Sequence, residues 1–117
     1  LIYTAEVRDS TGTARSAFSS DEELTAAAVI SNPCEHSITL TTMDTCLVAS
    51  ADMLGTALWG WPIVCGDAIT DWVIVAGGSV EQTQWASTKP PGSWDLTINF
   101  AIGGASATTS FTVTDSD

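Results

Sequence analysis

The C-terminal third of the chain contains the pattern that most constrains its fold. Five apolar residues alternate with other residues immediately before a pair of glycines, Gly103 and Gly104. Strict alternation places every second side chain on one face of a β-strand, and paired glycines tolerate the positive φ angles of a tight turn. The pattern therefore predicts a β-hairpin with one apolar face. The alternating residues are Trp94, Leu96, Ile98, Phe100 and Ile102.

The register of this hairpin follows if the two glycines form the whole loop. Ile102 then pairs with Ala105, and Leu96 faces Phe111. Apolar residues lie opposite apolar residues in this register, which favours it.

The rest of the chain repeats the strand pattern, and helical periodicity is almost absent. Segments rich in Thr, Val, Ile and Trp are broken by Gly, Pro, Asn and Asp at spacings of roughly ten residues. One segment allows two interpretations, a short helix over Asp21–Ala28 or a strand over Leu24–Ser31. The chain as a whole is typical of an antiparallel β-sandwich or barrel. Expected strands include residues 2–8, 15–18, 38–42 and 79–85. Cys46, Val48 and Ser50 share one face of a further expected strand that ends at residues 52–55, and Trp72 and Ile74 mark another.

Tryptophans are the most conspicuous candidates for a contact surface. Trp59 and Trp61 share a face on a short strand that Pro62 ends, so we expect Trp59 in the core and Trp61 at the strand end. Trp85 has the opposite parity to Val80, which predicts a bulge or a tryptophan at the rim. Trp61 and Trp85 are therefore candidate interaction residues, for a protein or a carbohydrate, although core filling is the simpler role.

Composition bounds the classes of function. The chain has 117 residues, which suits one domain over residues 1–117, and its formal net charge is −11. Lys plus Arg number 3 against 14 Asp plus Glu, so we expect no nucleic-acid partner. No apolar run approaches the ~20 residues of a membrane span, so we expect no membrane insertion. The chain begins with Leu1, which we interpret as a processed, exported protein, extracellular or at the cell surface.

Three cysteines allow one internal disulfide, and Cys46 with Cys65 is the preferred pair. A zinc site would need Cys34 and His36 to join these two thiols, and the spacing matches no usual zinc pattern. A calcium site in a loop stays open as an alternative. We otherwise expect no metal and no cofactor.

No catalytic residue can be assigned. The single histidine, His36, lies in an expected turn beside Glu35, and no nucleophile elbow precedes a helix. The sequence therefore indicates a protein that is not an enzyme.

The order of several short motifs resembles the BsuPI-type intracellular proteinase inhibitor family over about residues 24–113. This resemblance implies an all-β, immunoglobulin-like antiparallel β-sandwich and a protein-interaction module that resembles proteinase inhibitors. Residues 1–23 form an N-terminal strand and extension outside the match, and no reactive-site residue carries over. The matching motifs are Ser31-Asn32-Pro33 before Ile38-Thr39-Leu40, Asp52-Met53-Leu54-Gly55, Ala57-Leu58-Trp59-Gly60-Trp61-Pro62, Gly77-Gly78-Ser79 before Trp85, and Pro91-Gly92-Ser93-Trp94.

Two segments are further candidates for contact with a protein partner. Lys89 lies in a Pro-rich loop and could be presented to a trypsin-like protease, although a solvated lysine in a turn is the plainer interpretation. The apolar segment Leu1 to Arg8, with Ile2 and Tyr3, either forms the first strand of its own sandwich or completes the sheet of a neighbouring copy. The second interpretation predicts a structural subunit of an extracellular filament or cell-envelope layer, a homo-polymer assembled by strand donation.

Overall fold

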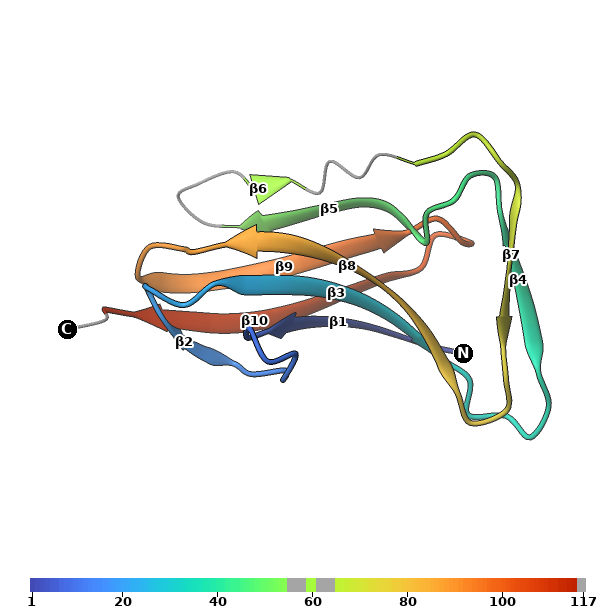
Figure 1. The fold of residues 1–117 in the computed structure, drawn as a ribbon, viewed down its shortest axis with the longest axis horizontal. Coiled ribbons are helices and arrows are strands. Elements are labelled where there is room, and N and C mark those ends of the chain that lie inside the picture. Colours follow the sequence, from blue (N-terminus) through green and yellow to red (C-terminus); the bar gives the residue numbers. More distant parts are fainter. Residues whose placement is uncertain (55–58, 61–64, 116–117) are drawn as a thin grey trace.

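The computed structural model describes residues 1–54, 59–60 and 65–115, and this part of the chain is all-β (Figure 1). The strands are β1 (Ile2–Arg8), β2 (Ala17–Ser19), β3 (Leu24–Ser31), β4 (Ile38–Thr42), β5 (Val48–Leu54), β6 (Trp59–Gly60), β7 (Thr70–Ile74), β8 (Ser79–Ser87), β9 (Gly92–Phe100) and β10 (Ser106–Thr114).

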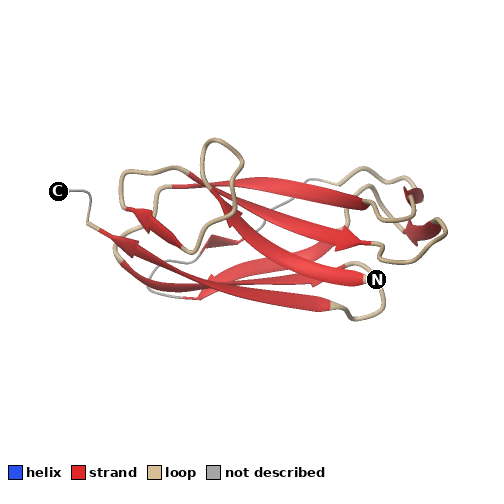
Figure 2. Cartoon of the chain, turned by 90° about the horizontal axis from the view of Figure 1, so that it is seen from below, coloured by secondary structure: helices blue, strands red, loops and turns tan. Residues whose placement is uncertain are grey.

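Two sheets form the body of the molecule as facing layers (Figure 2). One sheet has the order β1-β3-β8 and the other has the order β2-β10-β9-β5-β6. All neighbours are antiparallel except β2, which runs parallel to β10. Apolar residues from both sheets fill the space between the layers, because each strand turns alternate side chains inward. The central core side chains include Val7, Ala26, Ile30, Leu96, Ile98, Phe111 and Val113.

β3 forms as a strand, so the helical interpretation of Asp21–Ala28 is wrong. β3 is the central strand of its sheet and is paired on both sides. Arg8 of β1 forms an ion pair with Glu81 of β8, with 2.7 Å between Nη2 and Oε2, and this pair spans β3. Ala27 on β3 is fully buried. Small residues therefore suit a strand that is covered on both faces, and this pairing overrides the local helix signal.

The predicted C-terminal hairpin is present, but its register differs by two residues. Phe111 pairs with Trp94, not with Leu96. The turn at Gly103 and Gly104 does form, yet Ala101 donates its backbone N–H to the Leu47 carbonyl oxygen at 2.8 Å. This contact takes Ala101 out of the hairpin ladder. A slip of two residues keeps the alternation, so the apolar face still points into the core.

β5 also departs from the regular pattern. Its pairing with β9 shifts between Val48 and Ser50. Val48 and Ala51 are buried while Ser50 is exposed, so the expectation that Cys46, Val48 and Ser50 share one face is wrong. A bulge inserts one extra residue and reverses the parity after it.

The short edge strand expected at residues 15–18 forms as β2, which begins two residues later and ends one residue later. The pairing of β8 with β3 is regular from Val80 to Trp85. Its register shift lies between Trp85 and Ser87, directly after the tryptophan at which a bulge was expected. The predicted disulfide is confirmed, since Cys46 and Cys65 are joined with a Cα–Cα distance of 5.6 Å.

Candidate interaction surface

A separate two-stranded sheet, β4 with β7, stands at one end of the long axis of the molecule (Figure 1). We call it the arm. Its inner face closes the end of the sandwich, because Leu40 and Trp72 pack against the core and Ile74 is buried in it. The Trp72 ring nitrogen donates to the Thr42 hydroxyl at 3.1 Å, which fixes the indole on this inner face.

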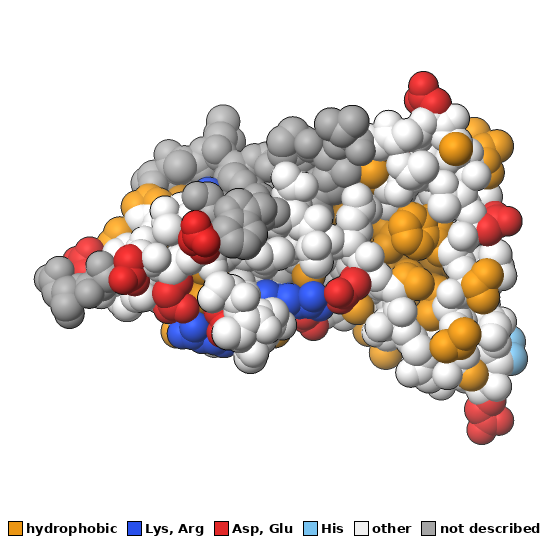
Figure 3. Space-filling model, viewed as in Figure 1, with side chains coloured by type: hydrophobic (Ala, Val, Ile, Leu, Met, Phe, Trp, Pro, Cys, Tyr) orange, Lys and Arg blue, Asp and Glu red, His pale blue; other side chains and the backbone are white. Residues whose placement is uncertain are grey.

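The outer face of the arm exposes aliphatic side chains. Met43 is 80% exposed, Ile69 68%, and Val73 and Val75 59% each. Val73 lies on β7 opposite Thr39 of β4, and the other three residues directly adjoin the ends of these two strands. Figure 3 shows hydrophobic side chains gathered over the arm end of the molecule. We call these four residues the aliphatic surface. Such a patch is typical of a contact site, since isolated exposed apolar residues are common but clusters are not.

Asn32 anchors the arm to the sandwich. Its side-chain nitrogen donates to the carbonyl oxygens of His36 and Ile74, both at 2.9 Å, while its oxygen accepts from the Cys34 backbone N–H at 2.9 Å. The Asn32 backbone also exchanges bonds with Gly77 and Gly78. The residue is 1% exposed. One buried and fully bonded amide therefore joins the end of β3 to the turn before β4 and to the end of β7.

Both arginines are held by carboxylates of the same chain. Arg8 contacts Glu6 and Glu81, and hydrogen bonding from Arg8 lowers the pKa of Glu81. Arg15 Nη1 lies 2.6 Å from Glu22 Oε2. The pKa of Glu22 is lowered, chiefly because the Ser19 backbone N–H donates to it and then because of Arg15. Neither arginine offers a basic patch, and neither belongs to the arm.

The N-terminal candidates, Ile2 and Tyr3, lie on β1, which pairs along its whole length with β3 of its own chain. Ile2 is 54% exposed, whereas the Tyr3 ring packs edge-to-face on Phe100 with centroids 5.1 Å apart. The inward residues Ala5 and Val7 are buried. In this structure β1 therefore serves its own sandwich.

The loop lysine is not exposed, contrary to expectation. Lys89 is 8% exposed, and burial lowers its pKa. A lysine in this position is not displayed as a protease substrate would be. Trp61 lies outside the described residues, and so do the side-chain surroundings of Trp85 and Trp59.

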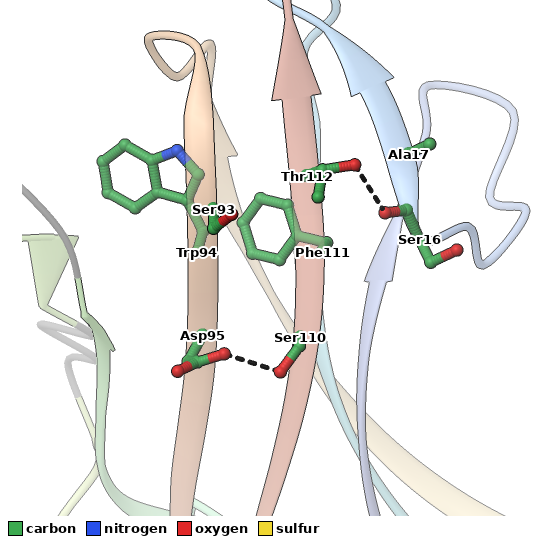
Figure 4. A pocket seen from close by; sticks show the side chains of 8 residues that line it. All are labelled: Ser16, Ala17, Ser93, Trp94, Asp95, Ser110, Phe111 and Thr112. Carbon is green, nitrogen blue, oxygen red and sulfur yellow. Dashed lines mark hydrogen bonds between the residues drawn. The ribbon is translucent and has the colours of Figure 1, made fainter.

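A shallow hollow of about 460 Å³ lies on the sheet of β2, β9 and β10 (Figure 4). Hydroxyl groups dominate its rim, and they bond to neighbours: Ser110 donates to Asp95 at 2.6 Å. Asp95 is the only titratable residue in the lining. The lining residues of the hollow are Ser16, Ala17, Ser93, Trp94, Asp95, Ser110, Phe111 and Thr112.

Among the described residues one group has the spacing of a metal site, namely Asp44, Cys46 and Cys65. Both sulfurs belong to the disulfide, so they offer no thiolate, and Asp44 already accepts from the Cys46 backbone N–H at 3.0 Å. Cys34 and His36 do not join this group. His36 is exposed in its turn.

Sequence reasoning did not select the aliphatic surface. The signal was present in the run Ile69–Val75, where five of seven residues are aliphatic or aromatic and one is charged. Such a run also fits a buried strand, so only the placement of β7 at an edge reveals it as a surface.

No protein-family model matches the chain, and no curated protein sequence matches it. Within the described residues there is no helix with the length and apolar character that crossing a membrane requires. The class of the molecule therefore rests on its own geometry: an all-β, disulfide-containing sandwich with an apolar arm.

Proposed function

We propose that this chain is a non-enzymatic protein-interaction module that contacts its partner through the outer face of the arm. The observation that carries the proposal is the aliphatic surface. It supplies four of the six large hydrophobic residues that are exposed in the described chain, the other two being Leu1 and Ile2. Each aliphatic side chain gains roughly 1.5–3 kcal/mol when a partner buries it fully.

The strand order supports an immunoglobulin-like sandwich, which is a common scaffold for protein contacts. β3 and β8 pair in one sheet, and β5, β9 and β10 lie together in the other. The B and E strands and the C, F and G strands of immunoglobulin domains divide in the same way. The arm is then an insertion at one end of the sandwich, where such domains commonly place their contact loops.

The disulfide supports an exported protein. Disulfides persist in oxidising compartments and are rare in the cytosol, so the Cys46–Cys65 bond favours an extracellular or cell-surface site. The net charge of −11 favours the same setting for a protein that must stay dispersed in salty water.

The resemblance to BsuPI-type inhibitors favours a protease as the partner. Because Lys89 is buried, we propose that contact does not use a lysine in a reactive loop. Contact through the aliphatic surface would instead block a protease sterically, without entering its catalytic site as a substrate.

Titration against a panel of proteases of different catalytic classes tests this proposal. We expect at least one peptidase activity to fall, and we expect Val73→Glu to restore it by placing a charge in the contact. Thr108→Glu is the matched control, since it adds the same charge on an exposed strand of the sandwich. Unchanged activity across the whole panel would remove inhibition from consideration.

A second candidate function is that of a filament subunit joined by strand donation. The observation that favours it is that β1 is an edge strand whose inward residues fill the core. An identical strand from a neighbouring copy would fit the same slot. Deleting Leu1 to Arg8 should then leave a soluble domain without fibres in negative-stain micrographs. Fibres that persist after the deletion would exclude this mode of assembly.

A further inference from the structure

We infer that the free edge of β7 pairs with β7 of a second copy, antiparallel about a two-fold axis, so that two arms form one four-stranded sheet. The inference goes beyond the proposed function: it uses the same arm, but it names a second copy of this chain as the partner in place of a protease. Among the described residues β7 has one hydrogen-bonded neighbour, β4, and its other edge carries no strand. A two-stranded sheet is only marginally stable alone, so added strands stabilise it.

The β7 edge lacks the features that normally keep edges apart. Residues 69–75 contain no lysine, proline or glycine. The one charged residue is Asp71, and its carboxylate accepts a hydrogen bond from the Thr41 hydroxyl of β4 at 2.7 Å. That bond holds the charge toward β4, on the side away from the free edge. β7 therefore presents a β-prone edge that no charge blocks.

Within the part of the chain that the structure describes, the other strand edges are protected or short. On β1, the Val7 carbonyl accepts from the Arg15 backbone N–H at 3.0 Å. On β8, the Gln82 side chain accepts from the Leu47 backbone N–H at 2.7 Å. β2 has three residues and β6 has two. This comparison leaves the arm as the place where a strand of another molecule could pair. Within the arm we select β7 over β4, because the outward residues within β4 are threonines.

A second copy fits this edge for two reasons. Antiparallel pairing of a strand with itself brings the same face of both copies together. The outward Ile69, Val73 and Val75 of two copies then share one face of the joined sheet, with Asp71 between Ile69 and Val73. The contact is also isologous, and it closes with two copies. A partner that is recognised by charge would find only Asp71 on this face of β7, already bonded within the arm.

The net charge sets the conditions for pairing. Each copy carries −11, so two bodies repel one another at low ionic strength. Salt screens this repulsion over a Debye length of about 10 Å at 0.1 M, while apolar burial is not weakened. Dimerisation should therefore strengthen as salt is raised, which is the reverse of an association driven by opposite charges.

Sedimentation velocity over a range of protein and NaCl concentrations tests the inference. The wild-type chain should shift from a monomer of 12.2 kDa to a dimer as either concentration rises. Val73→Glu should weaken dimerisation about tenfold or more, because it sets a carboxylate beside Asp71 of either copy at the new strand pair. Thr39→Glu is the control, since it adds the same charge on the same face one strand farther from the edge.

A second variant guards against an effect of Val73→Glu on folding. Val75→Glu lies just beyond β7 and should weaken the dimer in the same direction while leaving the circular dichroism spectrum unchanged. A wild-type chain that stays monomeric throughout overturns the inference, and so does a Thr39→Glu variant as impaired as Val73→Glu. Neither result involves a protease, so the proposed function is tested separately by the peptidase titration.

Discussion

At the scale of single residues, Asn32 determines whether the arm is positioned at all. Its amide group satisfies carbonyl groups on both sides of the arm base while its backbone continues β3 into the sandwich. No local pattern marks this residue beyond the turn that Asn32-Pro33 predicts. Its role depends on Ile74, which lies 42 residues later in the chain.

Replacing Asn32 with Asp should destabilise the protein by about 3 kcal/mol, because a carboxylate would face carbonyl oxygens in a site that is 1% exposed. Urea unfolding followed by tryptophan fluorescence measures this loss. Asn99→Asp is the control: Asn99 is exposed and its side chain donates to the Ser50 hydroxyl, so we expect a change below about 0.5 kcal/mol. Equal losses in the two variants would contradict the anchoring role.

At the scale of elements, hydrogen bonds to the Glu22 carboxylate hold the two ends of β2 in place. Glu22 accepts from the Ser19 backbone N–H at 2.9 Å and from Arg15 at 2.6 Å, so the carboxylate links the two ends of this short strand. These bonds lower the pKa of Glu22 below its usual value of 4.5. A carboxylate whose pKa is lower in the folded protein than in the unfolded chain stabilises the fold at pH values above the unfolded-state pKa. This stabilisation is lost as the pH falls through the folded-state pKa.

The Glu22→Gln variant should therefore be less stable than the wild type at pH 7, with a difference that shrinks below about pH 4.5. Denaturant midpoints of the two proteins, compared between pH 7 and pH 3, provide the measurement. A difference that stays constant or grows in acid would show that the charge of Glu22 does not support β2.

The disulfide links the segment before β5 to the segment before β7 across 19 residues. Replacing both cysteines with serine should cost about 3 kcal/mol, because the unfolded chain regains the freedom of a closed loop of this length. Thermal and urea unfolding with and without a reducing agent measure it. Cys34→Ser, at the free cysteine, should leave the free energy of unfolding unchanged. A loss of about the same size in this variant would contradict the pairing of Cys46 with Cys65.

Strands and their alternation could be predicted because both depend on neighbours within a few residues. β1, β4, β7 and the C-terminal hairpin lie where the pattern places them. What could not be predicted depends on distant contacts: the bond from Ala101 to Leu47 that shifts the hairpin, and the pairing of β4 with β7. The burial of Lys89 belongs to the same class, since a Pro-rich loop gives no sign of what covers it.

At the scale of the whole molecule, the charge balance governs stability as well as association. Carboxylates outnumber cationic side chains by 14 to 3, and both arginines are already paired within the chain. The excess negative charge therefore repels itself in the folded state, and screening should relieve that repulsion.

We expect the melting temperature to rise as NaCl is increased from about 10 mM to about 150 mM, over which the Debye length falls from about 30 Å to about 8 Å. Differential scanning calorimetry on dilute protein measures this rise without a contribution from dimers. A melting temperature that falls with salt would mean that the ion pairs of Arg8 and Arg15 dominate over the net repulsion.

The candidate surface could be predicted only in part at this scale. Composition favoured protein contact as an expectation, and the candidate residues for it were Trp61, Trp85, Lys89, Ile2 and Tyr3. The aliphatic surface arises because β4 and β7 leave the two main sheets and pair with each other. A sequence shows that Val73 and Val75 are apolar and does not show that no second layer covers them.

Backbone amide hydrogen exchange, resolved by residue and compared between dilute and concentrated protein, tests most directly the claim that the arm carries the contact surface. If the arm carries the contact, exchange slows in β7, residues 70–74, as protein concentration rises at constant salt, while β1 and the rest of the sandwich stay unchanged. Slowed exchange confined to β1 and its partner β3, with the arm unaffected, would contradict it.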